Sequence, residues 1–136
     1  MTTYHNVIDY IDITATAGNA LDKSDLTLAR GELAGVEGPT YGYACGGFQG
    51  AYKNTVDYIN ITTTITNAVD KGDLTVARSN LGGVCDSTYT YGFLGGGFNG
   101  SNKNQIDYID ITTTSGNATD RGDLSNSRYA MGSVNA

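Results

Sequence analysis

Apolar and polar residues alternate along short stretches of this chain, and this pattern predicts β-strands. Gln105–Ile111 shows the two-residue period most clearly, and Thr112–Thr114 would extend that strand with β-branched residues. Ser79–Cys85 and Tyr89–Phe98 predict two further strands joined by a polar turn, and Asp123–Ser125 begins a fourth. No stretch keeps helical spacing over three turns. The pattern therefore predicts an all-β fold.

The predicted strands recur along the chain. Asn6–Thr14 returns as Asn54–Thr62 and again as Asn104–Thr112, at a spacing of about 50 residues. Each copy then runs through Asn-Ala to an Asp-x-x-Asp-Leu motif and an arginine. Four short antiparallel strands in each unit indicate the blade of a β-propeller, because a solenoid would need a much shorter period.

The repeat makes the chain a single array and not a set of separate domains. We place the units at approximately 6–36, 37–84 and 85–134, with partial units at both ends. A unit of this size cannot bury its own faces, so the array must share one continuous core.

Charge and composition exclude several classes of function. The net charge is −6, and the eight lysines and arginines are spread among the acids, whereas nucleic-acid binding requires clustered basic residues. No apolar run approaches the ~20 residues that span a bilayer. Met1–His5 lacks the basic and apolar regions of a signal peptide. We therefore expect no nucleic-acid partner, no membrane insertion and no secretory route.

Side chains suited to catalysis are scarce. The sequence contains one histidine, His5, and no serine in a nucleophile elbow. The glycine-rich run that begins at Gly95 matches a dinucleotide-binding fingerprint in its letters, but a predicted strand follows it where the fingerprint needs a helix. We therefore expect no enzymatic activity, no catalytic residues and no cofactor. Cys45 and Cys85 occupy different places in the repeat, so we expect two reduced thiols in strands.

Each copy of the repeat carries two aspartates three residues apart, in a segment that we expect to form a turn. In one interpretation, one aspartate caps the turn through backbone N–H groups and the other meets a repeated arginine or lysine, so that no metal is bound. In the alternative, the carboxylates and backbone carbonyls hold calcium. The pairs are Asp22 and Asp25, Asp70 and Asp73, and Asp120 and Asp123, of which the last four residues are the candidate calcium ligands.

The order of these motifs resembles the kelch repeat. In this chain a glycine doublet, an apolar-Asp-Tyr strand and an arginine before the next strand follow one another, in the order of the doublet, tyrosine and arginine of kelch. Two features depart from the kelch pattern, because its tryptophan is missing and the acid precedes the tyrosine. The matching positions are Gly46, Gly47, Gly96 and Gly97 for the doublet, Tyr10, Tyr58 and Tyr108 for the tyrosine, and Arg30, Arg78 and Arg128 for the arginine. We expect these arginines to tie adjacent blades together.

A closer resemblance is to kelch-like repeats found in structural and tail-fibre-like proteins of bacteriophages, notably marine and cyanobacterial phages. Ile106–Leu124 matches that pattern closely, and the resemblance covers nearly the whole chain. It implies a propeller fold, a place on the virion or extracellular particle surface after assembly in the host cytoplasm, and no catalytic residues.

The resemblance also sets the order of the blades. The chain would begin with the last two strands of one blade, at Asn6–Leu26, and stop after the first strand of another, at Arg128–Val134. Fewer than three blades cannot close a ring, since propellers use about four to eight. We therefore expect a homo-oligomer that completes a ring, such as a dimer with about six blades, and an open fibre is the alternative.

These observations lead to one expected function and two alternatives. We expect a non-enzymatic structural or adhesive virion protein, such as a fibre, decoration or appendage component, with other virion proteins among its partners. The first alternative is a glycan-binding, lectin-like module, because repeated Tyr, Asn, Asp and Thr are typical of carbohydrate-binding surfaces. The second is a fragment of a longer propeller.

Overall fold

The computed structural model of the chain describes residues 3–63 and 66–132, and all regular elements in that part are β-strands. β1 (Val7–Tyr10) and β2 (Leu21–Asp25) form a two-stranded sheet. The next sheet contains β3 (Ala34–Glu37), β4 (Tyr41–Cys45), β5 (Thr55–Asn60) and β6 (Val69–Asp73) in chain order. The last contains β7 (Gly82–Cys85), β8 (Tyr91–Gly95), β9 (Lys103–Asp110) and β10 (Thr119–Arg128), again in chain order.

Every pairing between these strands is antiparallel, so the predicted all-β antiparallel fold is confirmed. One predicted strand extension is wrong, because β9 ends at Asp110 and not at Thr114. Oδ1 of Asp110 accepts hydrogen bonds from the backbone N–H and the hydroxyl of Thr112, at 2.8 and 2.6 Å. These local bonds turn the chain away from the ladder despite the β-propensity of threonine. The strand expected at Arg128–Val134 is not formed over residues 129–132, since β10 ends at Arg128, and Ser133 and Val134 lie outside the described residues.

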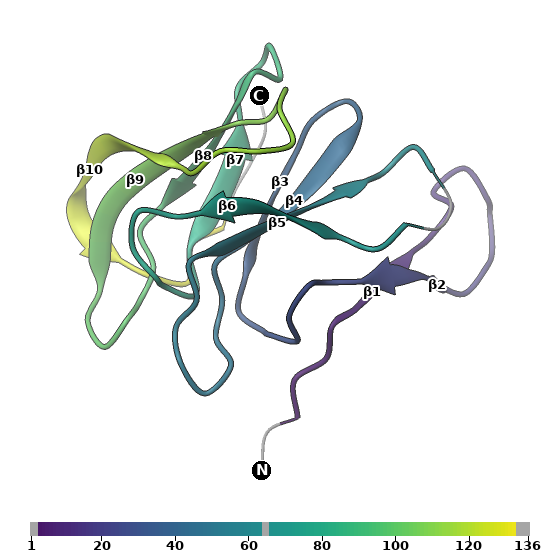
Figure 1. Cartoon of the computed structure of the whole chain (residues 1–136), viewed down its shortest axis with the longest axis horizontal. Coiled ribbons are helices and arrows are strands. Elements are labelled where there is room, and N and C mark those ends of the chain that lie inside the picture. The colour runs from purple at the N-terminus through teal and green to yellow at the C-terminus, as the bar shows by residue number, and fades with distance from the viewer. Residues whose placement is uncertain (1–2, 64–65, 133–136) are drawn as a thin grey trace.

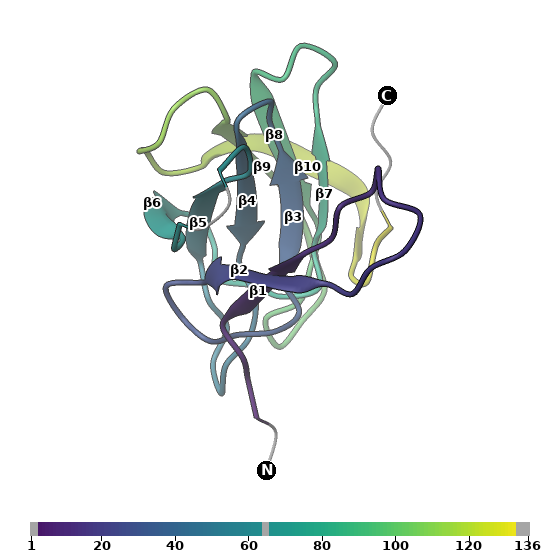
Figure 2. The same ribbon diagram turned by 90° about the vertical axis from the view of Figure 1, so that its right-hand side faces the viewer.

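The three sheets follow one another across the molecule, with β9 and β10 at one side and β1 and β2 at the other (Figure 1). The core lies between the two four-stranded sheets, where β3 contacts β7. Val36, Tyr43 and Val56 enter it from the first of these sheets, and Leu94 and Ile109 enter it from the second. Seen from the side of the two-stranded sheet, β1 and β2 lie in front of β3 and β4 (Figure 2).

Glycines set how closely these two sheets approach. A Cβ atom on Gly83 would lie 2.4 Å from the carbonyl oxygen of Gly35. A Cβ atom on Gly92 would lie 2.8 Å from Cγ2 of Val36. A side chain at Gly83 would therefore push the two backbones apart, and one at Gly92 would displace the buried side chain of Val36.

The first glycine doublet follows β4, at a point where two connections between sheets pass. Gly46 and Gly47 have φ angles of 65° and 116°, which favour glycine. A Cβ atom on Gly46 would lie 2.5 Å from the carbonyl oxygen of Arg78, in the connection that leaves the sheet. A Cβ atom on Gly47 would lie 2.7 Å from that of Gly31, in the connection that enters it.

The second doublet repeats this arrangement after β8. A Cβ atom on Gly96 would lie 2.6 Å from the carbonyl oxygen of Arg128, and one on Gly97 would lie 2.9 Å from that of Ser79. Each doublet therefore accommodates both connections of its sheet, which explains why the motif needs two consecutive glycines.

The two cysteines are buried in β4 and β7, which confirms that both lie in strands. Burial raises the pKa of the Cys45 thiol to about 12. Burial also raises the pKa of the Cys85 thiol.

Candidate functional site

A buried ion pair joins the first two sheets. Arg30 lies in the connection between β2 and β3, and its Nη1 is 2.9 Å from Oδ2 of Asp57 on β5. Its Nε donates to the carbonyl oxygen of Gly46 at 2.8 Å, and its Nη2 donates to that of Ala44 at 3.0 Å. The guanidinium therefore fixes the incoming connection to two strands of the following sheet.

The same ion pair recurs one repeat later. Arg78 lies in the connection between β6 and β7, and its Nη1 is 3.0 Å from Oδ2 of Asp107 on β9. Its Nη2 donates to the carbonyl oxygen of Leu94 at 3.1 Å. Both side chains are fully buried.

A threonine completes each ion pair. The backbone N–H and the hydroxyl of Thr27 donate to the two carboxylate oxygens of Asp57, at 3.1 and 2.6 Å. Thr75 donates to Asp107 in the same way, at 3.0 and 2.6 Å. A buried carboxylate is costly unless it is paired and hydrogen-bonded, and each aspartate has both kinds of partner. We call each set of threonine, arginine and aspartate a Thr–Arg–Asp cluster.

A lysine on the last strand of each of the first two units reaches the next sheet. Nζ of Lys71 on β6 donates to the carbonyl and hydroxyl oxygens of Thr113, at 2.8 and 3.0 Å. Nζ of Lys23 on β2 donates to the carbonyl oxygen of Thr63. Burial lowers the pKa of Lys71, and its ammonium lies 5.7 Å from the ring centre of Tyr43.

The repeated Asn-Ala motif also bonds to the preceding unit. Asp73 on β6 donates its backbone N–H to Oδ1 of Asn117 at 3.0 Å, and its carbonyl accepts from the N–H of Ala118 at 2.8 Å. Asp25 on β2 makes the same two bonds with the following unit, at 3.4 and 2.9 Å. Each junction between units is thus closed by a Thr–Arg–Asp cluster, a lysine and an Asn-Ala motif.

The paired acids lie in strands, which corrects the expectation that they form turns. Asp70 and Asp73 belong to β6, and Oδ1 of Asp70 accepts the N–H of Gly72 at 2.8 Å. The register with β5 shifts at this point, so the Asp-x-Gly sequence marks a bulge. Asp120 bonds to Gly122 in β10 in the same way, at 2.8 Å. The strand continues because pairing resumes beyond the bulge.

The arginines do not pair with these acids in the described residues. Arg30 and Arg78 bond instead to the aspartates of the apolar-Asp-Tyr strands. The candidate calcium ligands Asp70, Asp73, Asp120 and Asp123 are exposed. Within residues 3–63 and 66–132, no three His, Cys, Asp or Glu side chains gather closely enough to hold a metal ion.

The repeated tyrosines pack against other side chains of their own sheets. The ring of Tyr58 meets that of Tyr41 edge-on, with centroids 5.4 Å apart, and Tyr108 meets Tyr91 at 5.3 Å. Tyr10 instead lies 5.8 Å from Nζ of Lys23. These contacts give the tyrosines a packing role.

A row of aromatic side chains crosses from one sheet to the next. The ring centroids of Tyr4 and Phe48 are 6.2 Å apart, and those of Phe48 and Tyr52 are 5.1 Å apart. The row continues from Tyr52 to Phe98 at 6.0 Å and from Phe98 to Tyr129 at 5.6 Å. It adds a hydrophobic contact at every junction.

Sequence reasoning predicts that the arginines tie units together but does not identify Asp57 and Asp107 as their partners. A signal is present, since each copy places an aspartate beside an apolar residue in a strand that the fold must bury. Thr27 and Thr75 are missed as well, although each lies three residues before its arginine.

No family of known proteins matches this chain, and a search of curated proteins finds no significant relative. In the part of the chain that the structure describes, no helix is long and apolar enough to cross a membrane.

Proposed function

We propose that the chain is a non-enzymatic structural or adhesive protein of a virion, such as a fibre, decoration or appendage component. In this proposal its four-stranded sheets are kelch-like propeller blades, and several copies complete the assembly. The observation that carries the proposal is how the chain uses its repeated polar side chains. At the two buried junctions, a threonine, an arginine and a lysine of one unit bond to the next unit, which supplies the aspartate.

Polar side chains that join neighbouring units suit a mechanical role. Neighbouring units are joined by fully buried ion pairs and by the hydrogen bonds around them, so the sheets form a stiff array. The resemblance of the repeat to those of phage structural proteins supports placing this array in a particle.

Mass spectrometry of purified phage particles tests the proposal. We expect the protein in fixed proportion to the capsid proteins after washing at high salt. Its presence only in the soluble fraction of infected cells would contradict a structural role. Negative-stain microscopy of the purified protein tests the propeller, which should appear as a ring of about four to eight blades.

Exposed tyrosines favour glycan binding as a second candidate function. Tyr89 and Tyr91 are 44% and 39% exposed beside the turn between β7 and β8. Exposed tyrosine rings offer an apolar face on which sugars can stack and a hydroxyl that can hydrogen-bond. A glycan array with the wild type and Tyr89→Ala tests this function. Specific hits that the substitution abolishes, together with absence of the protein from particles, would favour the lectin.

A further inference from the structure

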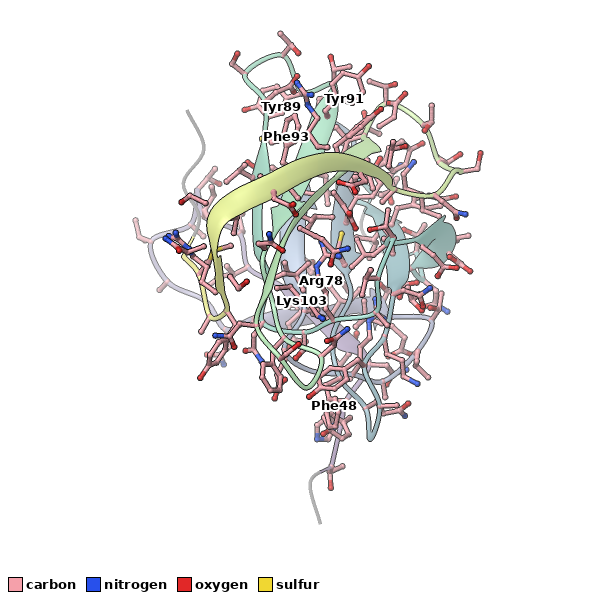
Figure 3. The ribbon with its side chains drawn as sticks, turned by 90° about the vertical axis from the view of Figure 1, so that its left-hand side faces the viewer. Phe48, Arg78, Tyr89, Tyr91, Phe93 and Lys103 are labelled. Carbon is pink, nitrogen blue, oxygen red and sulfur yellow. The ribbon has the colours of Figure 1, made fainter. Side chains whose placement is uncertain are left out.

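The sheet β7–β10 has an open face made of the positions that the sheet β3–β6 buries. Val36 and Leu74 of the earlier sheet are buried against β7–β10. Val84 and Leu124 hold the same places in the repeat but are only half-buried, and with Phe93 they line a cleft of about 350 Å³. Figure 3 looks at the molecule from the side of β9 and β10 and labels Phe93. This face therefore carries the same kinds of side chain as the face of β3–β6 that is buried at the junction.

The arginine of the last repeat is exposed at this end. Arg128 occupies the place of Arg78, and its carbonyl accepts the N–H of Gly97 at 2.9 Å, as that of Arg78 accepts the N–H of Gly47 at 3.0 Å. Within residues 3–63 and 66–132, its side chain donates only to the carbonyl oxygen of Asn126, at 3.4 Å. Among the described residues, no carboxylate forms an ion pair with Arg128.

The outer strand of this sheet also has space for a neighbour. In the buried junction, a Cβ atom on Gly72 would lie 2.6 Å from Oδ1 of Asn117, which comes from the next unit. Gly122 holds the same place in β10 and also has a positive φ, but no described residue lies within 4 Å of its Cβ position. Arg121, the counterpart of Lys71, is exposed beside it.

The hairpin β1–β2 carries the complementary groups. Asp9 holds the place of Asp107, but it is exposed, and its carboxylate makes no hydrogen bond or ion pair with the described residues. Ile11 holds the place of Ile109 and is 57% exposed, whereas Ile109 is 1% exposed. The hairpin therefore exposes side chains whose counterparts in the later units are buried at the junctions.

We propose that the open face of β7–β10 binds the β1–β2 hairpin of a second copy of this chain, with Arg128 of one copy paired to Asp9 of the next. The inference rests on the proposed structural function and supplies its assembly contact. Arg121 would donate to the loop between β1 and β2 of the second copy, as its lysine counterpart does in the buried junction. The second copy's Asn19 and Ala20 would bond to the backbone of Asp123.

A second copy fits this surface because the two ends match in charge and shape. The β7–β10 end offers two arginines and an apolar cleft, and the β1–β2 end offers a free carboxylate and exposed isoleucines. The two surfaces differ, so the contact runs head to tail. Repetition of that contact closes a ring or extends a filament, depending on the angle between copies.

A charge-swap experiment tests the pairing. Asp9→Arg and Arg128→Asp each place like charges together when a variant meets itself, and we expect each to weaken self-association about a hundredfold. In a mixture of the two variants, the native Arg128–Asp9 pair forms at one contact, and a pair with the two charges exchanged forms at the next. Alternating copies should therefore restore assembly. Analytical ultracentrifugation of each variant and of the mixture measures the effect against the 14.3 kDa monomer.

The controls are Asp73→Arg and Lys53→Glu, which change charge by the same amounts in and beside the sheet β3–β6 and should leave assembly unchanged. Circular dichroism and melting curves establish whether each variant is folded. If a charge-swap variant does not fold, Asp9→Asn and Arg128→Gln provide a milder pair of substitutions. A wild type that stays monomeric at every concentration overturns the inference, as does a folded mixture that fails to assemble. A monomeric protein that is nevertheless found in particles would overturn this contact alone and leave the structural function standing.

Discussion

Arg78 and Asp107 come from successive repeat units and form an ion pair of 3.0 Å with both side chains fully buried. Replacing Arg78 by methionine leaves the carboxylate of Asp107 buried without its counter-charge. We expect the free energy of unfolding to fall by about 3–5 kcal/mol. Chemical denaturation measures the loss.

A double-mutant cycle separates the pair from its surroundings. Asp107→Asn should also destabilise the protein, but the double variant should lose less than the sum of the two single losses. Lys103→Met, which removes a positive charge that donates to an exposed serine hydroxyl, should change stability by less than about 0.5 kcal/mol. Additive losses would show that the two charges do not interact.

Gly46 and Gly50 separate the effect of space from that of backbone conformation. Their φ angles are 65° and 64°. A Cβ atom on Gly46 would lie 2.5 Å from the carbonyl oxygen of Arg78, whereas no atom of the described part of the chain lies within 4 Å of a Cβ atom on Gly50. Gly50→Ala should cost about 1–2 kcal/mol, the strain of a left-handed residue. Gly46→Ala should cost clearly more, because the segment after β4 must also move away from the connection that carries Arg78. Equal losses in thermal or chemical unfolding would argue against the close approach.

The hydroxyl of Tyr43 crosses between sheets and donates to the carbonyl oxygen of Ile111 at 2.9 Å. Phe93 holds the same place one repeat later, so phenylalanine fits the local backbone. Tyr43→Phe should therefore lower the free energy of unfolding by about 0.5–1.5 kcal/mol through the lost hydrogen bond. Tyr91→Phe, at an exposed tyrosine, is the matched control and should have little effect.

Acid should weaken the turn that ends β9. Hydrogen bonds from the side chain and backbone of Thr112 hold the pKa of Asp110 below its usual value of 3.8. The folded protein therefore favours the carboxylate more than the unfolded chain does. The resulting stabilisation is present above pH 3.8 and is lost as the pH falls through the lowered pKa.

The variant Asp110→Asn checks this sign. Its melting temperature should lie below that of the wild type at about pH 5, and the difference should shrink as the pH falls to about 2. A difference that stays constant across this range would show that the carboxylate charge does not contribute.

The strands are predictable because their alternation and their turn residues are local signals. The repeat adds the expectation that units pack on one another, and the core between β3–β6 and β7–β10 agrees with it. Aspartate and glycine favour both turns and bulges, so the sequence alone predicts turns for the Asp-x-Gly segments. Only the structure distinguishes a bulge from a turn, because it shows that β6 pairs with β5 on both sides of Gly72.

The partners of the arginines require the three-dimensional register. Arg30 and Asp57 are 27 residues apart in the sequence, and Arg78 and Asp107 are 29 apart. No local rule selects those aspartates over the acids of β6 or β10. The contact forms because the connection carries its arginine across to the middle strands of the following sheet.

The Thr–Arg–Asp cluster also governs how the gene for such a protein can change in length. Each cluster draws its threonine and arginine from one unit and its aspartate from the next, so duplication or deletion of a whole unit leaves every cluster complete. Gain or loss of half a unit would leave an arginine or an aspartate charged and alone inside an apolar interface. Recombination within the repeat is therefore tolerated in whole units, and the number of units can vary while the chemistry of each junction stays the same.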